Sequence, residues 1–134
     1  MSEENTIKSP AKIVGRYWNS RADLMYYQYI YYILRAAAPE ARSLLDVGTR
    51  DCGYLEWMDW IEQRVSIDLV KPYRSETVRG EVADFFDYRP QRRFDVVLCS
   101  QVLEHVPEAD RFARKLFETG DKVLITVPYR WSPR

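Results

Sequence analysis

The sequence predicts an α/β fold, a three-layer sandwich built around a mainly parallel sheet of five strands. Two observations predict it. Short apolar runs of strand length alternate along the chain with segments of helical periodicity, which is the order typical of parallel sheets. Several of these runs also end in a polar residue directly after the apolar part, as buried strands do where they leave a sheet.

The first expected element is a helix that Asn19 or Ser20 caps and that Pro39 stops, near Ala38. Apolar residues recur along it at spacings of three and four, which predicts one buried face, at Leu24, Tyr27, Ile30, Tyr31 and Leu34. Strands are expected over residues 43–48, 64–68, 81–84, 94–100 and 122–127. Two further helices are expected over residues 54–61 and 108–118, and Gly120 ends the second one.

Composition narrows the classes of partner and compartment. The chain of 134 residues fits a single domain, expected over residues 16–134 after a flexible segment at residues 1–15. Its 20 basic and 20 acidic residues balance, so no nucleic-acid partner is expected. No apolar run is long enough to span a membrane, and the polar, acidic start is not a signal peptide. Cys52 and Cys99 lack metal-ligand spacing, so we expect a cytoplasmic protein with reduced thiols and no metal site.

Acidic residues follow three of the expected strands. Asp46, Asp68 and Asp84 each come at the end of an apolar run, and Ser100 and Gln101 end a fourth. The carboxyl ends of parallel strands meet at one edge of the sheet, where ligands of open α/β sheets bind. A carboxylate at that edge either stays hydrated or meets a ligand, so the sequence predicts a binding crevice there.

The loop after the first strand reads Gly48-Thr49-Arg50-Asp51-Cys52-Gly53. It keeps the first and last glycines of G-x-G-x-x-G, with Arg50 at the middle one. Gly48 permits a tight turn or a close approach of the backbone to a ligand. An ordinary connection from strand to helix also favours glycine, so this loop alone leaves both interpretations open.

Four segments in order, LLDVGTRDCG, VSIDL, EVADFFDY and FDVVLCSQVLEHVP, resemble those of class I S-adenosylmethionine-dependent methyltransferases of a type 11-like kind. The last segment is the most specific match, and the resemblance covers roughly residues 40 to 129. It implies a Rossmann-like fold, S-adenosylmethionine as cofactor and methyl transfer as the reaction.

The resemblance also assigns roles to individual residues. Asp46, Gly48 and Gly53 belong to the loop that holds the methionine end of the cofactor, and Asp68 takes the ribose hydroxyls. Asp84 accepts from the adenine amine, with Phe85 beside the ring, and Ser100 and Gln101 lie beneath the sulfonium. The full set of implied cofactor contacts is Asp46, Gly48, Thr49, Arg50, Gly53, Asp68, Leu69, Asp84, Phe85, Ser100 and Gln101.

Charge favours this cofactor over a dinucleotide, because an acidic crevice suits a sulfonium cation better than a pyrophosphate. The sequence departs from the family pattern in two places. Arg50 stands near a usual glycine, where its side chain crowds the cofactor or pairs with its carboxylate. The family also continues past the fifth strand, whereas this sequence ends soon after Pro128. We therefore expect the fifth strand to be an exposed edge, in a truncated chain or one covered by a second copy in a homodimer.

The leading functional hypothesis is methyl transfer to an oxygen or nitrogen of a small-molecule acceptor. His105 is the candidate base, although a histidine at a helix start that only hydrogen-bonds is an equal alternative. Glu104 is expected to be a capping or solvated carboxylate, and Tyr17 and Trp18 either a lid or surface packing. Two other classes stay open: a cofactor-binding or assembly module without turnover, and a dinucleotide oxidoreductase.

Overall fold

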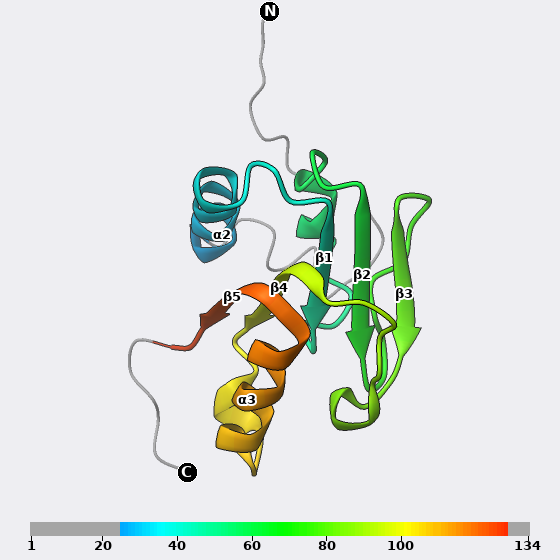
Figure 1. The fold of residues 1–134 in the computed structure, drawn as a ribbon, viewed down its shortest axis with the longest axis vertical. Helices are drawn as coiled ribbons and strands as arrows, with labels where there is room; N and C mark the ends of the chain where they lie inside the picture. Colours follow the sequence, from blue (N-terminus) through cyan, green and yellow to red (C-terminus); the bar gives the residue numbers. More distant parts are fainter. Residues whose placement is uncertain (1–24, 129–134) are drawn as a thin grey trace, which may run out of the picture.

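The computed structural model describes residues 25–128, and Figure 1 shows the arrangement of their helices and strands. The expected segment 1–15, the start of the first helix, Tyr17 and Trp18 lie outside these residues. The strands are β1 (Ser43–Val47), β2 (Gln63–Asp68), β3 (Val78–Val82), β4 (Phe94–Ser100) and β5 (Gly120–Thr126). They form one sheet in the order β3-β2-β1-β4-β5, and every pairing in it is parallel. The predicted five-stranded parallel sheet is confirmed.

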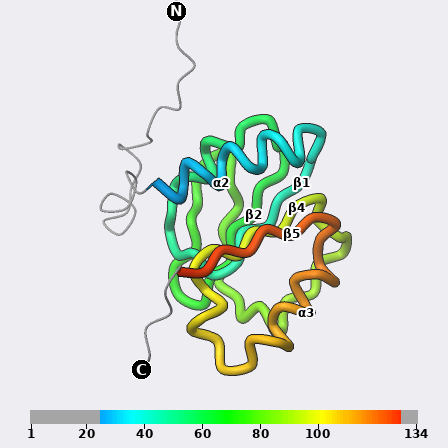
Figure 2. The backbone as a smooth tube through the Cα atoms, turned by 90° about the vertical axis from the view of Figure 1, so that its left-hand side faces the viewer, coloured from blue at the N-terminus to red at the C-terminus, as the bar shows by residue number. Residues whose placement is uncertain are grey.

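Helices cover both faces of this sheet. The longer ones are α2 (Met25–Ala37) and α3 (Ala109–Thr119), and short 3-10 helices follow three of the strands: η1 (Gly53–Trp57), η2 (Phe85–Asp87) and η3 (Leu103–His105). Figure 2 shows α2 on one side of the sheet and α3 on the other. The three layers of the predicted sandwich are therefore present.

Each face of the sheet has its own hydrophobic core. On one face, Tyr27, Ile30 and Leu34 of α2 are at most 3% exposed and pack with Leu44 and Leu98 of the sheet. These three residues belong to the apolar stripe that the sequence predicts. On the other face the core is formed by α3, η2 and the remaining inward side chains, including Leu45, Ile67, Phe85, Phe112 and Leu116.

Two expected elements differ from the observed ones. The helix expected over residues 54–61 is only the single 3-10 helix η1, followed by turns. Leu55, Met58 and Ile61 are all fully buried, and the Leu55 carbonyl accepts a hydrogen bond from the Arg64 side chain. The chain thus leaves helical geometry after Trp57 while all three of these side chains stay in the same core. The third strand covers Val78–Val82 rather than residues 81–84, because its pairing with β2 begins at Val78 opposite Arg64.

The last helix and the last strand are joined without a loop. Thr119 ends α3 and Gly120 begins β5, so Gly120 terminates the helix as expected and also starts the strand earlier than expected. A Cβ atom at Gly120 would stand 2.4 Å from Cγ2 of Val97, which leaves room for glycine alone. β5 lies at one edge of the sheet and pairs only with β4 among the described strands.

The sheet order places the topological switch point between β1 and β4, the two central strands. The chain runs from β1 outward to β3 and then returns to β4, so connections leave these two strands in opposite directions. Loops that diverge in this way open a crevice at the carboxyl ends of the two strands. No helix within residues 25–128 has the length and apolar character needed to cross a membrane.

Candidate functional site

The loop after β1 turns sharply at the switch point. Gly48 has a φ of 76°, and its N–H donates to the Ile67 carbonyl of β2 at 2.8 Å. Arg50 has a φ of 61°, in the left-handed region that glycine adopts easily. The residue at which the sequence departs from the glycine pattern therefore keeps the backbone conformation of a glycine. Thr49 is buried between them, and Gly53 is buried at the start of η1.

Asp46 is buried completely within β1 rather than exposed at its tip. Its Oδ1 accepts hydrogen bonds from the Thr49 hydroxyl at 2.6 Å and from the Tyr54 hydroxyl at 3.0 Å. Its Oδ2 is buried and has no hydrogen-bond partner among residues 25–128. Burial raises the pKa of this carboxyl to about 7, a net result in which the two hydroxyl donors lower the pKa and the charge of Asp68 raises it. Asp46 thus takes up or releases a proton near neutral pH.

Asp68 ends β2 and is held by backbone donors. Its Oδ1 accepts from the Arg50 N–H at 3.1 Å, and its Oδ2 accepts from the N–H groups of Val70 and Lys71 at 3.0 and 2.9 Å. The side chain is therefore fixed at the mouth of the crevice, between the β1 loop and the β2 loop. Each carboxylate oxygen can accept more than one hydrogen bond, so capacity for a ligand hydroxyl remains.

The residues expected at the adenine end of the cofactor differ in their exposure to solvent. Asp84 is exposed and caps η2, where its Oδ1 accepts from the Phe86 N–H at 3.0 Å. Leu69 is 68% exposed directly after Asp68. Phe85 is only 4% exposed, and its ring centroid lies 4.9 Å from that of Phe112. Phe85 is therefore part of the core beneath α3.

The carboxyl end of β4 is tied to that of β5. The hydroxyl groups of Ser100 and Thr126 lie 2.8 Å apart, and the Gln101 N–H donates to the Thr126 carbonyl at 2.8 Å. Gln101 has a φ of 59°, and its side-chain amide donates to the Thr126 hydroxyl at 3.2 Å. A non-glycine residue in this backbone region stores local strain, which is typical of functional sites.

Two acids are buried although the sequence did not predict their burial. Asp51, in the β1 loop, has a side chain that is 7% exposed and forms an ion pair with Lys71 at 3.3 Å. Glu104, expected to be solvated or capping, has a side chain that is only 6% exposed. Its Oε2 lies 3.5 Å from Nε2 of His105, whose side chain is 56% exposed. Nothing in the local sequence distinguishes these acids from solvated ones, because their burial comes from the fold.

These acids gather along one edge of the sheet. The charge of Asp68 raises the pKa of Asp46. Burial, together with the charges of Asp46 and Glu104, raises the pKa of the Cys99 thiol to about 12. Among the described residues, three buried carboxylate oxygens have no hydrogen-bond partner: Asp46 Oδ2, Asp51 Oδ1 and Glu104 Oε1. Unpaired buried acceptors of this kind suit a cationic ligand rich in N–H and O–H donors.

The cysteines lie in separate cores. Cys52 packs with α2, with its Sγ 3.3 Å from the Tyr27 hydroxyl, and Cys99 packs in the opposite core. Within residues 25–128, no three His, Cys, Asp or Glu side chains are grouped so that they could hold a metal ion.

A model of the methyltransferase domain family matches residues 19–131. The chain belongs to this family. The match covers the whole described sheet, with the β1 loop and the buried acids at its carboxyl edge. A search of curated protein sequences found no significant match.

Solved structures of methyltransferases share the fold. The plantazolicin methyltransferase BpumL, solved with a desmethylPZN analogue and SAH, is 14% identical with a TM-score of 0.58, over 78% of this chain and 46% of that one. The methyltransferase domain of bacterial CtHen1 is 17% identical with a TM-score of 0.60, over 75% and 64%. The sugar N-methyltransferase KedS8 from Streptoalloteichus is 19% identical with a TM-score of 0.58, over 85% and 49%. This methyltransferase chain thus spans between about half and two thirds of these neighbours' length.

Proposed function

We propose that this methyltransferase domain binds S-adenosylmethionine at the carboxyl edge of its sheet and transfers the methyl group to an oxygen or nitrogen of a small molecule. The observation that carries the proposal is the set of buried carboxylates at the switch point. Asp46 and Asp51 each leave one buried oxygen unpaired there, and Asp68 is fixed between the two loops. The sulfonium and ammonium groups of this cofactor would place positive charge beside these carboxylates, of which Asp51 already has an ion pair with Lys71.

The residues present fit this cofactor. Asp68 is oriented by three backbone N–H groups and would accept the ribose hydroxyls, as carboxylates commonly do in related sheets. Leu69 and Val70 are 68% and 74% exposed beside it, and either would cover an apolar ring. The left-handed turns at Gly48 and Arg50 bring backbone close to the crevice. When bound, the cofactor supplies a methyl group on an already activated leaving group.

The chain's own contribution to the reaction is then alignment and proton removal. His105 is the residue that we propose as base. It follows β4 in η3, and the Glu104 carboxylate lies 3.5 Å from its Nε2. A carboxylate at this distance would orient the imidazole ring for removal of a proton from the acceptor.

Calorimetric titration with S-adenosylhomocysteine tests the cofactor site. The wild-type chain should bind it saturably, and Asp68→Asn should weaken binding at least about tenfold because an amide cannot replace both acceptor oxygens. Asp59→Asn is the matched control, since Asp59 is exposed and makes no hydrogen bond or ion pair with the described residues. Circular dichroism of each variant establishes that it is folded. Absence of binding to the folded wild-type chain would refute the proposal.

A second candidate is a binding or assembly module that keeps the cofactor but lacks turnover. It is favoured by the edge strand β5, which pairs with β4 alone among the described strands and whose Val123, Leu124 and Ile125 are only half-buried. Such an edge would pair with the same strand of a second copy. Cofactor binding without methyl transfer to any of a panel of sugars and amines, together with a dimer in sedimentation, supports this alternative.

A further inference from the structure

A cavity of about 430 Å³ lies at the opposite end of the sheet from the crevice. Its walls are the loop that leads into β4 and the last turn of α3, with Tyr88, Arg89, Pro90 and Arg92 on the loop side and Lys115 on the helix side. This loop ends at Arg93, immediately before the first residue of β4, whereas the crevice lies beyond the last. The Arg89 and Lys115 side chains reach back to the Phe86 carbonyl in η2, so the cavity follows the loop between β3 and β4 along the α3 side of the sheet.

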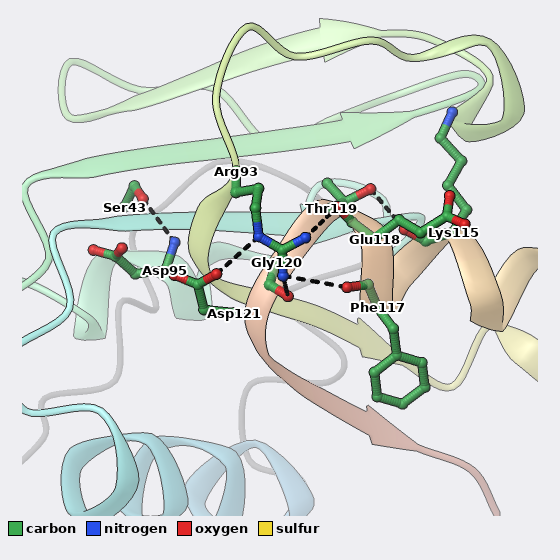
Figure 3. Close-up of polar contacts among 9 residues, drawn as sticks. All are labelled: Ser43, Arg93, Asp95, Lys115, Phe117, Glu118, Thr119, Gly120 and Asp121. Carbon is green, nitrogen blue, oxygen red and sulfur yellow. Dashed lines mark hydrogen bonds and ion pairs between the residues drawn. The ribbon is translucent and has the colours of Figure 1, made fainter.

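One wall of the cavity is rigid. Arg93 donates from Nε to Asp121 at 2.8 Å, and from its two terminal nitrogens to the carbonyls of Glu118 at 2.7 Å and Gly120 at 2.6 Å. Figure 3 shows this guanidinium group among the backbone oxygens that end α3 and begin β5. Arg93 thus connects the loop to the end of α3 through these hydrogen bonds, and its charge is balanced by Asp121.

The other cations of the cavity lack a carboxylate partner. Arg89 uses only Nη1, which donates to the carbonyls of Phe86 and Tyr88 at 2.8 and 2.9 Å. Lys115 donates to the same two carbonyls, at 2.9 and 2.7 Å. Arg92 is exposed and makes no hydrogen bond or ion pair with the described residues. Nε and Nη2 of Arg89 and the whole Arg92 guanidinium therefore remain available as donors.

The charges in the cavity are unbalanced. Besides Arg93, three cations line it, and Glu118 is the one acid among its lining residues. Arg89 lies close enough to Lys115 to contribute, after desolvation, to a lowered pKa of that ammonium group. Arg89 and Lys115 thus donate to the same pair of carbonyl oxygens, and the charges of Asp87, Asp84 and Glu118 act on Lys115 in the opposite sense. An anionic ligand would accept from the N–H groups of Arg89 and Arg92 that these carbonyls leave unused.

We propose that this cavity binds the phosphate group of a small phosphorylated molecule, at a site separate from the cofactor crevice. Guanidinium groups match the paired oxygens of a phosphate, and Arg89 and Arg92 offer two of them beside an ammonium group. The Tyr88 ring and Pro90 provide apolar surface for the rest of the ligand. The volume lies within the range of small-molecule sites. S-Adenosylmethionine has no phosphate, so the two sites take chemically different ligands.

Calorimetric titration of the whole chain with ribose 5-phosphate, and with ribose as the uncharged control, tests this proposal. The phosphate ester should bind saturably and ribose should not. The double variant Arg89→Ala, Arg92→Ala should weaken binding at least about tenfold. Arg114→Ala is the matched control, because Arg114 is exposed on α3, lies outside the cavity lining and makes no hydrogen bond or ion pair with the described residues. It should bind as the wild type does.

Three outcomes would overturn the proposal. The first is no saturable binding of ribose 5-phosphate to the folded wild-type chain, and the second is equal weakening of that binding by Arg114→Ala. The third is much tighter binding of a short RNA that is weakened equally by loss of Arg89, Arg92 or Arg114. The last two would indicate a diffuse attraction for polyanions rather than a site. Titration of the double variant with S-adenosylhomocysteine separates this test from that of the proposed function. Its affinity for that ligand should equal that of the wild type, whether or not the phosphate site exists.

Discussion

Replacing Asp46 with asparagine should remove a large part of the pH dependence of stability in this protein. Burial raises the pKa of Asp46 from 3.8 to about 7. Because the folded pKa lies above the unfolded one, the folded state binds the proton more tightly. The stability that this provides is complete below about pH 4 and is lost as the pH rises to about 7.

The size of the effect follows from the shift. A difference of about three units corresponds to about 4 kcal/mol between the two ends of this range, since each unit is worth about 1.4 kcal/mol. Asp46 is completely buried, so solvent screening does not reduce the figure. Asparagine does not titrate, and its carbonyl oxygen can still accept from the Thr49 and Tyr54 hydroxyls.

Urea denaturation followed by tryptophan fluorescence measures this difference. Between pH 4.5 and pH 7.5, the free energy of unfolding of the wild type should fall by about 3 kcal/mol relative to that of Asp46→Asn. Asp59→Asn, which removes an exposed carboxylate, should follow the wild type across the same range. A constant difference between wild type and Asp46→Asn would refute the reasoning, because it would mean that Asp46 does not titrate there.

Three further predictions follow from the same geometry. Binding of S-adenosylmethionine near pH 7 should release part of a proton, because a cation near Asp46 lowers the pKa of this carboxyl. The heat of binding should therefore differ between phosphate and Tris buffers. In Asp46→Asn the heat of binding should be the same in both buffers. Gly120→Ala should cost about 1–3 kcal/mol in urea denaturation, because its Cβ would stand 2.4 Å from the Val97 side chain. Gly48→Ala, at a φ of 76° and with Val102 3.1 Å away, should cost about 1–2 kcal/mol in thermal denaturation, and an unchanged melting temperature would contradict the strained turn.

The parallel sheet of five strands and the buried face of α2 could be predicted from the sequence. Runs such as residues 94–100 are apolar throughout, as expected of strands covered on both faces, and the spacing of Tyr27, Ile30 and Leu34 is helical. The irregular conformation of residues 54–61 could not be predicted, because Leu55, Met58 and Ile61 follow one another at a spacing of three, which also fits a helix. What decides against a helix is a partner from β2, the Arg64 side chain that binds the Leu55 carbonyl.

The candidate site was predicted in part. Asp46 and Asp68 lie close together at the carboxyl edge, as expected for neighbouring parallel strands. The sequence does not predict that Asp46 is buried or that its Oδ1 accepts hydrogen bonds from two hydroxyl groups. The core position of Phe85 depends on Phe112, a residue 27 positions later in the chain. Tertiary partners of this kind leave no local signature, and Glu104 was missed for the same reason.

The direct junction of α3 and β5 restricts how this chain can change in length. One residue inserted between Thr119 and Gly120 has no loop to absorb it. It would either rotate the helix by about 100° on its axis or reverse which way each side chain of the strand faces. The reversal would exchange Leu124 with Val123 and Ile125 between the two cores. Insertions and deletions should therefore accumulate in other connections and spare this one.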